Sequence, residues 1–399
     1  MEWKTVKISD VGNIVTGKTP STKVPAYYDN GDILFIGPSD LSACSKHVLT
    51  SEKHITFEGR KSLGNNVIPK GAVCVSCIGT IGYVGVSNSD CATNQQINSI
   101  IVKDGVDADF IYYVMRNMWI VFKSLEGQST TLSILNKSHF ANLEIQIPSL
   151  DTQHRIAAIL SSLDDKIENN NRINRNLEEQ AQALFKSWFV DFEPWGGTMP
   201  EDWREVSLNE MTSKFGTGLN PRKNFKLGEG ENYYVTIKNM GNNRVYLDDS
   251  CDKVTDEAIE KINKRSKLQA GDLLFSGIGT IGRVALVTET PTNWNTSESV
   301  FNLHPANNIS SEFLYVLLLS DVFQKYVKVH AQGGVQQGIR MASLKDYKMY
   351  IPEDSKMKQF DSHIIPIITR IKNIDKENDR LATLRDTLLP KLMRGEIAL

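Results

Sequence analysis

The chain carries one sequence pattern twice, and this internal repeat constrains its fold more than any other feature, because two copies of a segment should form two copies of a structure. Residues 71–84 (GAVCVSCIGTIGYV) return as residues 271–284 (GDLLFSGIGTIGRV), at an offset of 200. A later pair, 143–148 (LEIQIP) and 347–352 (YKMYIP), has an offset of 204, as insertions in surface loops would produce. With 399 residues, the chain can bury a separate core in each copy.

Each copy changes character along its length. In the first copy, short β-rich runs at 33–36, 72–76 and 83–86 precede one helix expected at 110–125, whose counterpart is 313–329. After Pro148 and Pro352 the pattern becomes that of a long amphipathic helix. We therefore predict an α+β fold with two globular mixed α/β domains and two spacer helices. Their predicted bounds are 1–150 for the first domain, 151–195 for its helix, 196–353 for the second domain, and 354–399 for the distal helix.

Both helices show a heptad pattern, because apolar or small residues recur at alternating steps of four and three. The seam of the first helix runs from Ile156 to Trp188, and that of the second from Phe360 to Leu392, at a constant offset of 204. We predict that the helices pair as an antiparallel coiled coil with an approximate twofold axis. A helix from 152 to 189 would be about 57 Å long. Asn174 and Asn378 hold equivalent seam positions and are predicted to meet and fix the register. The alternative is that each helix lies on its own domain.

Composition limits the setting in which the chain can work. No apolar run is long enough to span a bilayer and the first residues do not resemble a signal peptide, so we expect a cytoplasmic protein. The five cysteines, at 44, 74, 77, 91 and 251, follow no disulfide spacing and should be reduced. The formal net charge of −2 excludes nucleic-acid binding by bulk basicity. Any contact with DNA must be local, or shared with a partner.

Three segments match known binding motifs, but the residues around each of them do not fit the structure that the motif requires. Residues 12–19 (GNIVTGKT) fit a phosphate-binding loop, but Pro20 and Ser21 mark a turn where that loop needs a helix. Residues 277–282 (GIGTIG) fit a dinucleotide fingerprint, but a strand pattern follows them. Cys74 and Cys77 have zinc-ligand spacing without a second pair. We predict neither a catalytic residue nor a metal site.

Both copies contain loops rich in side chains that can read base edges. Lys and Arg suit guanine, Asn and Gln suit adenine, and Ser and Thr also hold phosphates. Polar loops are common, so each residue could equally be ordinary surface. The candidate DNA-binding residues are Lys18, Thr19, Ser21, Thr22, Lys23, Asn94, Gln95, Gln96, Gln128, Ser129, Thr130 and Thr131 in the first copy, and Asn220, Arg222, Lys223, Asn224, Lys238, Asn239, Gln332, Gln336, Gln337 and Arg340 in the second. The copies share their framework and differ in these loops, which fits two heads that bind different sequences.

The order of domain, helix, domain, helix resembles the specificity subunit of type I restriction-modification systems. The segments that close the helices, 184–194 (LFKSWFVDFEP) and 388–397 (LLPKLMRGEI), carry this resemblance. It implies two target recognition domains, each for one half of a bipartite site on double-stranded DNA, and helices that set the gap and dock two methyltransferase subunits. Endonuclease and translocase subunits would join this core. S-adenosylmethionine, ATP and Mg²⁺ would belong to these partners, and this chain would hold no cofactor.

An aromatic cluster at the end of the first helix has two explanations. It could dock the methyltransferase, or it could pack between the helix end and the next domain. Its members are Phe185, Trp188, Phe189, Phe192 and Trp195. For the whole chain, two other functions stay open: a coiled-coil scaffold that binds only proteins, and a nuclease or methyltransferase with an unrecognised site.

Overall fold

A computed structural model describes residues 3–126, 134–333 and 337–397. The chain divides into two compact units, Met1–Arg172 with Asp375–Leu399, and Ile173–Ile374. Each unit contains the globular part of one repeat and about half of each long helix. Over the described residues, no helix has both the length and the apolar character that a membrane span requires.

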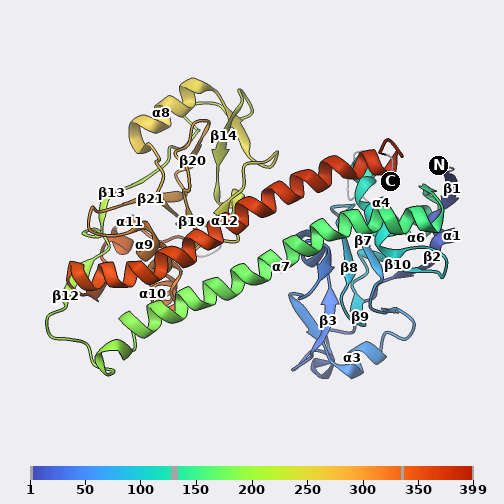
Figure 1. Cartoon of the computed structure of the whole chain (residues 1–399), viewed down its shortest axis with the longest axis horizontal. Helices are drawn as coiled ribbons and strands as arrows, with labels where there is room; N and C mark the ends of the chain where they lie inside the picture. Colours follow the sequence, from blue (N-terminus) through green and yellow to red (C-terminus); the bar gives the residue numbers. More distant parts are fainter. Residues whose placement is uncertain (1–2, 127–133, 334–336, 398–399) are drawn as a thin grey trace. The chain divides into compact units, whose positions relative to one another are not determined.

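The first unit is built on two sheets and a strand pair (Figure 1). The larger sheet has the order β2-β10-β7-β8-β4 and the smaller β5-β3-β9-β6, while β1 pairs with β11. The strands are β1 Lys4–Lys7, β2 Gly12–Thr16, β3 Ile33–Ile36, β4 His47–Val48, β5 Lys53–Ile55, β6 Val67–Ile68, β7 Val73–Ser76, β8 Val84–Ser87, β9 Cys91–Thr93, β10 Ile97–Val102 and β11 Glu144–Ile147. The helices are α1 Ile8–Val11, η1 Pro25–Tyr27, α2 Pro38–Ala43, α3 Phe57–Lys61, α4 Ala108–Asn117, α5 Trp119–Glu126, α6 Lys137–Asn142 and α7 Leu150–Phe189.

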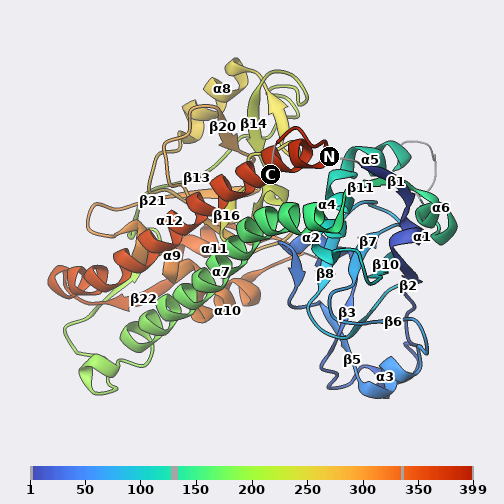
Figure 2. The ribbon, with the colours of Figure 1, turned by 45° about the vertical axis from the view of Figure 1, so that its right-hand side comes forward.

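The second unit repeats this plan (Figure 2). Its main sheet has the order β13-β21-β18-β19, its second sheet β17-β14-β20, and β12 pairs with β22. The strands are β12 Arg204–Ser207, β13 Thr212–Thr217, β14 Asn232–Val235, β15 Met240–Gly241, β16 Arg244–Val245, β17 Asp252–Val254, β18 Leu273–Ser276, β19 Val284–Leu286, β20 Trp294–Thr296, β21 Val300–Pro305 and β22 Lys348–Ile351. The helices are η2 Glu193–Trp195, η3 Ile237–Asn239, α8 Asp256–Ser266, α9 Ser311–Leu319, α10 Asp321–His330, α11 Met341–Lys345 and α12 Asp354–Met393.

Strand pairing confirms the duplication in detail. In both units the second sheet combines an antiparallel pair with a parallel pair, β3 with β9 in the first and β14 with β20 in the second. The pairing of Ile97 with Ser76 has its counterpart in Val300 with Ser276. The units differ in small additions, β4 and β6 in the first and the β15-β16 pair in the second.

The structure corrects the helix expected in each globular part, because two helices stand where one was predicted. In the first unit, α4 ends at Asn117 and α5 starts at Trp119. In the second unit, Ser320 separates α9 from α10. Its backbone is extended, and its hydroxyl accepts a hydrogen bond from the amide of Phe323, which caps α10. The apolar period continued across this cap, so the sequence pattern concealed the break.

Each unit holds one half of an antiparallel helix pair, which confirms the predicted coiled coil. In the first unit, Asp164 of α7 contacts Arg385 of α12, and Asn170 contacts Asn378. In the second unit, the rings of Trp188 and Phe360 lie 5.5 Å apart between centroids. Contacts at higher residue numbers of α7 thus involve lower residue numbers of α12, as expected for antiparallel helices. Most predicted seam positions are buried, including Ile156, Leu160, Ile167, Ala181, Phe360, Ile364, Ile371 and Leu392.

Candidate nucleic-acid interface

Two turns of the first unit meet at the ends of the strands that carry them. The first turn, residues 17–23, follows β2, and the second turn, residues 93–96, joins β9 to β10. The amide of Lys18 donates to the carbonyl oxygen of Thr93 at 3.0 Å. The hydroxyl of Thr19 donates to Oε1 of Gln95 at 2.5 Å. These bonds bring together two loops that lie more than seventy residues apart in the chain.

The second unit builds the same junction with different side chains. Its first turn, residues 218–224, follows β13, and its second turn, residues 296–299, joins β20 to β21. Nδ2 of Asn220 donates to Oε1 of Glu298 at 2.5 Å, in the place of the Thr19–Gln95 bond. The hydroxyl of Tyr234 lies 2.8 Å from the carbonyl oxygen of Leu219, as that of Tyr28 lies 2.6 Å from Pro20 O in the first unit. The junction is therefore a property of the repeat.

A third segment, the glycine turn, joins the second turn in both units. It covers residues 77–82 in the first unit and 277–282 in the second, between the two strands of a hairpin. The amide of Cys77 donates to the carbonyl of Gln96 at 2.7 Å, and that of Gly277 to Ser299 at 2.9 Å. This geometry is that of a hairpin turn, so the glycine spacing does not form a dinucleotide site.

Leu135 in the first unit and Ile339 in the second lie beside the glycine turn. The amide of Leu135 donates to the carbonyl of Cys77, and the amide of Ile339 to that of Gly277. In the second unit, the amide of Gly279 also donates to the carbonyl of Gln337 at 2.8 Å. In the first unit, backbone hydrogen bonds thus join four segments at one place, including two of the predicted polar loops. In the second unit they join the second turn, the glycine turn and the segment of Ile339, and the side-chain bond from Asn220 to Glu298 adds the first turn.

Close packing between the first and second turns requires glycine. A Cβ atom added at Gly17 would lie 2.1 Å from the carbonyl oxygen of Asn94, and one at Gly218 would lie 1.7 Å from that of Thr296. The atoms met are backbone atoms, which cannot rotate away. The two equivalent glycines therefore set the distance between the turns.

We expect Gly218→Ala to destabilise the second unit by about 1–3 kcal/mol, because the new methyl group forces the turns apart. Thermal unfolding measures the change. Gly216→Ala is the matched control, since a Cβ at that position of β13 meets no atom within 4 Å. It should alter stability by less than about 0.5 kcal/mol. Equal unfolding temperatures for the two variants would contradict this role of Gly218.

In the second unit the joined segments line a hollow of about 710 Å³. Its polar lining combines both signs of charge, from Lys238, Asp252, Arg283 and Glu298. Lys238 lies 3.3 Å from Asp252, and the guanidinium of Arg283 donates to the carbonyl oxygens of Ile237 and Met240. Burial and the negative charge of Glu298 raise the pKa of Tyr234, so its hydroxyl stays protonated and keeps the hydrogen that it directs at the first and second turns.

The predicted DNA-binding residues fall into three groups. Most described ones are exposed or half-buried, namely Lys18, Thr19, Ser21, Thr22, Lys23, Asn94, Gln95, Gln96, Asn220, Arg222, Lys223, Asn224, Lys238, Gln332, Gln337 and Arg340. Gln128, Ser129, Thr130, Thr131 and Gln336 lie outside the described residues. Asn239 is a correction. It is 1% exposed, and its amide binds the backbone of Thr236 and the hydroxyl of Ser250, so it stabilises a turn and cannot reach a base.

Sequence reasoning missed the second turn of the second unit. Residues 296–299 (TSES) share only their first residue with residues 93–96 (TNQQ), so the resemblance between them is not visible in the letters. Their common position appears only through the strand register of β10 and β21. Counting back two residues from the first residue of β10 and of β21 shows that Glu298 holds the position equivalent to Gln95.

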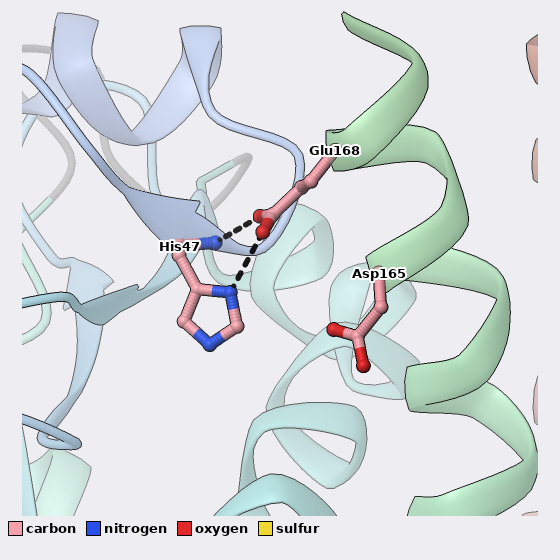
Figure 3. Close-up of side chains that lie close together, drawn as sticks. All are labelled: His47, Asp165 and Glu168. Carbon is pink, nitrogen blue, oxygen red and sulfur yellow. Dashed lines mark hydrogen bonds and ion pairs between the residues drawn. The ribbon is translucent and has the colours of Figure 1, made fainter. Parts of the chain in front are cut away.

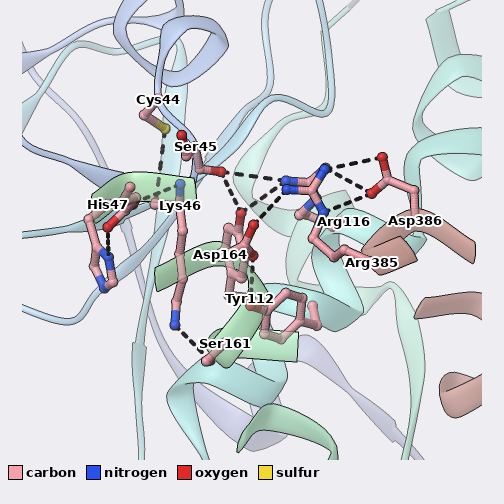
Figure 4. Close-up of polar contacts among 12 residues, drawn as sticks. Cys44, Ser45, Lys46, His47, Tyr112, Arg116, Ser161, Asp164, Arg385 and Asp386 are labelled. Carbon is pink, nitrogen blue, oxygen red and sulfur yellow. Dashed lines mark hydrogen bonds and ion pairs between the residues drawn. The ribbon is translucent and has the colours of Figure 1, made fainter. Parts of the chain in front are cut away.

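A polar network connects the globular part of the first unit to α4 and to the long helices (Figure 4). Lys46 is 1% exposed, and its ammonium group lies 2.9 Å from Asp109 and donates to Ser161 of α7 at 2.8 Å. The hydroxyl of Tyr112 donates to the carbonyl oxygen of Ser45 at 3.0 Å. A buried ammonium group is tolerated only when it is paired, so these contacts hold the segment that follows α2 firmly against α4 and α7.

At the centre of this network lies a buried ion pair between the two long helices. Arg385 of α12 donates to Asp164 of α7 at 2.6 Å, with side-chain exposures of 8% and 0%. Tyr113 donates to the other oxygen of Asp164 at 2.7 Å. Burial tends to lower the pKa of Arg385, but Asp386 and Asp164 raise it above its usual value, so the guanidinium stays charged.

The predicted register asparagines do occupy the seam. In the first unit, Asn378 accepts a hydrogen bond from Asn170 at 2.9 Å and donates to Asn171 at 2.9 Å. The described partners of Asn378 are therefore Asn170 and Asn171, which lie about one helical turn before the predicted partner, Asn174. Asn174 is buried and belongs to the second unit. Its pairing with Asn378 stays a prediction.

His47, Asp165 and Glu168 form the group of described residues that could offer ligand atoms to a metal ion (Figure 3). Glu168 is already engaged, because it accepts hydrogen bonds from Nδ1 of His47 at 2.9 Å and from the amides of Lys46 and His47. Although burial raises the pKa of Glu168, these hydrogen bonds lower it below its usual value. The geometry is that of a clamp between a loop and α7.

The aromatic cluster packs inside the second unit, which was one of its two predicted roles. Phe185, Trp188 and Phe189 are at most 7% exposed and belong to the core cluster of the unit. Phe189 lies 5.7 Å from Trp203 and 4.9 Å from Phe360, between ring centroids. These three side chains are covered by their own chain, which corrects their assignment to a docking surface. Docking by the half-buried Phe192 and Trp195 stays a prediction.

All five cysteines are free thiols in the structure. Cys74 and Cys77 are buried on and beside β7, and burial raises the pKa of each thiol to about 12. A protonated, buried thiol is neither a good nucleophile nor a metal ligand. The zinc-like spacing of these two residues therefore has a packing explanation.

Comparison with known proteins identifies relatives over the whole chain. The family described as Type I restriction modification DNA specificity domain matches residues 1–179 and again residues 200–385. The type I restriction enzyme MjaIX specificity subunit of Methanocaldococcus jannaschii is 28% identical, covering 99% of this chain and 94% of that protein. The HindI specificity subunit of Haemophilus influenzae is 26% identical, covering 72% and 76%.

A solved structure has the same fold. The S subunit of a type I restriction-modification system from M. genitalium superimposes with a TM-score of 0.56 at 18% identity, covering 98% of this chain and 96% of the other. The repeat, the mixed α/β domains and the long helices predicted from sequence are thus confirmed.

Proposed function

Because the chain belongs to the family of type I restriction modification DNA specificity domains, we propose that it is the DNA-specificity subunit of a type I restriction-modification complex. Each repeat recognises one half of a bipartite site on double-stranded DNA. The observation that supports this is the duplicated junction, in which a side-chain hydrogen bond between the first and second turns joins Thr19 to Gln95 in one unit and Asn220 to Glu298 in the other. A conserved scaffold with different contact groups suits two heads with different targets.

The helices α7 and α12 take two further roles in this proposal. They set the number of unspecified base pairs between the half-sites, and they dock two methyltransferase subunits. Endonuclease and translocase subunits join the assembly. S-adenosylmethionine, ATP and Mg²⁺ are used by these partners in the cytoplasm, while this chain is noncatalytic and contributes positioning of the complex on DNA.

Genome-wide mapping of methylated adenines tests the proposal. A host that expresses this chain with its methyltransferase should carry one bipartite motif, and the motif should disappear when this chain is deleted. Unchanged methylation after deletion would refute the specificity role. Methyl transfer by the purified chain alone would instead indicate an enzyme with its own active site.

Binding of the assembled chain and methyltransferase to the mapped duplex separates recognition from scaffolding. We expect salt-dependent binding, because phosphate contacts release counterions. A scrambled duplex should bind much more weakly. Equal affinity for both duplexes would favour a scaffold that contacts only proteins.

A further inference from the structure

Gln95 and Glu298 stand at the same place in the two repeats. Each lies in the second turn, two residues before the first residue of the following strand, β10 or β21. Oε1 of each accepts one hydrogen bond from the first turn, at 2.5 Å, from Thr19 in one unit and from Asn220 in the other. The position in the chain and the anchored oxygen are thus the same, although the donor is a hydroxyl in one unit and an amide in the other. The anchored side chain is an amide in Gln95 and a carboxylate in Glu298.

That difference reverses the hydrogen-bonding capacity at this place. Once Thr19 occupies Oε1 of Gln95, the amide still offers the two hydrogens of Nε2 as donors. An ionised glutamate has only acceptors, with room for about four hydrogen bonds on two oxygens. Glu298 receives one from Asn220, and the hydroxyl of Tyr234 lies 3.2 Å from its Oε2. Lone pairs of Glu298 therefore remain for a ligand.

A carboxylate at this position repels the phosphates of DNA, so its presence calls for a compensating contact. It lines the hollow of the second unit together with Lys238, Asp252 and Arg283, so the two positive charges of this lining are balanced by two carboxylates. Among the groups exposed in the major groove, the exocyclic amino groups of cytosine and adenine are the donors that a carboxylate can accept. Adenine also presents N7, an acceptor that a second carboxylate oxygen repels, whereas cytosine presents only its donor.

We propose that Glu298 accepts a hydrogen bond from the N4 amino group of a cytosine in the half-site of the second repeat, while Gln95 donates to a base acceptor in the other half-site. This assignment rests on the proposed function. It means that the residue at this position accepts a hydrogen bond from DNA in the second unit and donates one in the first unit. It gives a structural reason for the difference between TNQQ and TSES at equivalent positions of the two repeats.

Base analogues test the proposal with the unmodified protein. The chain assembled with its methyltransferase is bound to duplexes in which each cytosine of the site in turn is replaced by 2-pyrimidinone, which lacks the amino group. We expect one cytosine, in one half-site, at which affinity falls by about 5- to 150-fold, the factor that corresponds to 1–3 kcal/mol. The same replacement in the gap should have little effect.

Variants assign the contact to a residue. Glu298→Gln keeps an oxygen for Asn220 and should abolish the sensitivity to 2-pyrimidinone at that cytosine. Gln95→Glu should change base preference in the other half-site alone. Glu260→Gln, which removes an exposed carboxylate of α8, should change neither.

The outcomes separate the two claims. If the wild-type complex binds no bipartite site, the proposed function is wrong. If it binds one but tolerates 2-pyrimidinone at every cytosine, or if Glu298→Gln keeps the full sensitivity, the role of Glu298 is wrong and the proposed function stands. If Glu298→Gln does not fold, the analogue scan and Gln95→Glu still decide, because a site without a sensitive cytosine overturns the proposal.

Discussion

Replacing Arg385 by alanine should destabilise the first unit by about 3–5 kcal/mol, because it leaves the carboxylate of Asp164 buried without its counter-charge. Asp164 is fully buried, and its remaining described hydrogen-bond partner is the hydroxyl of Tyr113. Hydrogen exchange followed by mass spectrometry measures this change, since it reports on peptides of the first unit separately. Protection should fall in the first part of α7 and the last part of α12.

Replacing the whole polar cluster should cost far less than breaking it. The positions equivalent to Asp164 and Arg385 in the second unit are Ile368 and Ala181, both 2% exposed in an apolar core. The repeat itself thus shows that the helix pair can be apolar here. We expect Tyr113→Phe/Asp164→Leu/Arg385→Met to be about as stable as the wild type or more stable, since apolar side chains of similar volume avoid the desolvation penalty.

A surface ion pair on the same helices is the matched control for Arg385→Ala. Lys166 lies 3.5 Å from Glu377, and both side chains are nearly half exposed. Lys166→Ala should therefore change stability by at most about 1 kcal/mol. If Arg385→Ala were equally mild, or if the triple variant were as unstable as Arg385→Ala, the buried pair would not have the energetics that its burial indicates.

Deleting one heptad from each long helix should shorten the gap of the recognised site by about three base pairs while keeping both half-sites. Seven residues of helix span about 10.5 Å, and base pairs are about 3.4 Å apart. Removing residues 173–179 and 369–375 preserves the heptad seam and leaves the pairs of Asp164 with Arg385 and of Trp188 with Phe360 in place. Methylated motifs mapped genome-wide give the gap directly.

A four-residue deletion from each helix is the corresponding control. Seven residues make nearly two full turns, whereas four residues shift the seam out of register. We expect the four-residue variant to lose methylation. A heptad deletion that changed the half-sites, or left the gap unaltered, would show that the helices do not act as the spacer.

The sequence alone determined the features that depend on local periodicity and on comparison of one segment with another. The duplication, the two long helices and the heptad seam all follow from spacing that the chain repeats, although α7 ends at Phe189, before the predicted end at residue 195. The resemblance to the specificity-subunit family could also be found from the sequence, because it depends on the order of domains and helices along the chain. The break between α9 and α10 was lost for the same reason, since a serine cap does not interrupt an apolar period.

Only the tertiary structure decided which polar and aromatic residues do what. Asn239 and Asn220 look alike in a loop, yet one is enclosed by its own turn and the other anchors Glu298. Asp164 and Arg385 are separated by 221 residues and become partners only when α12 returns along α7. The burial of a side chain and the pairing of its charge depend on neighbours that come from distant segments of the chain. For that reason, the repeat could be predicted from the sequence, but the equivalent anchoring of Gln95 in the first unit and Glu298 in the second could not.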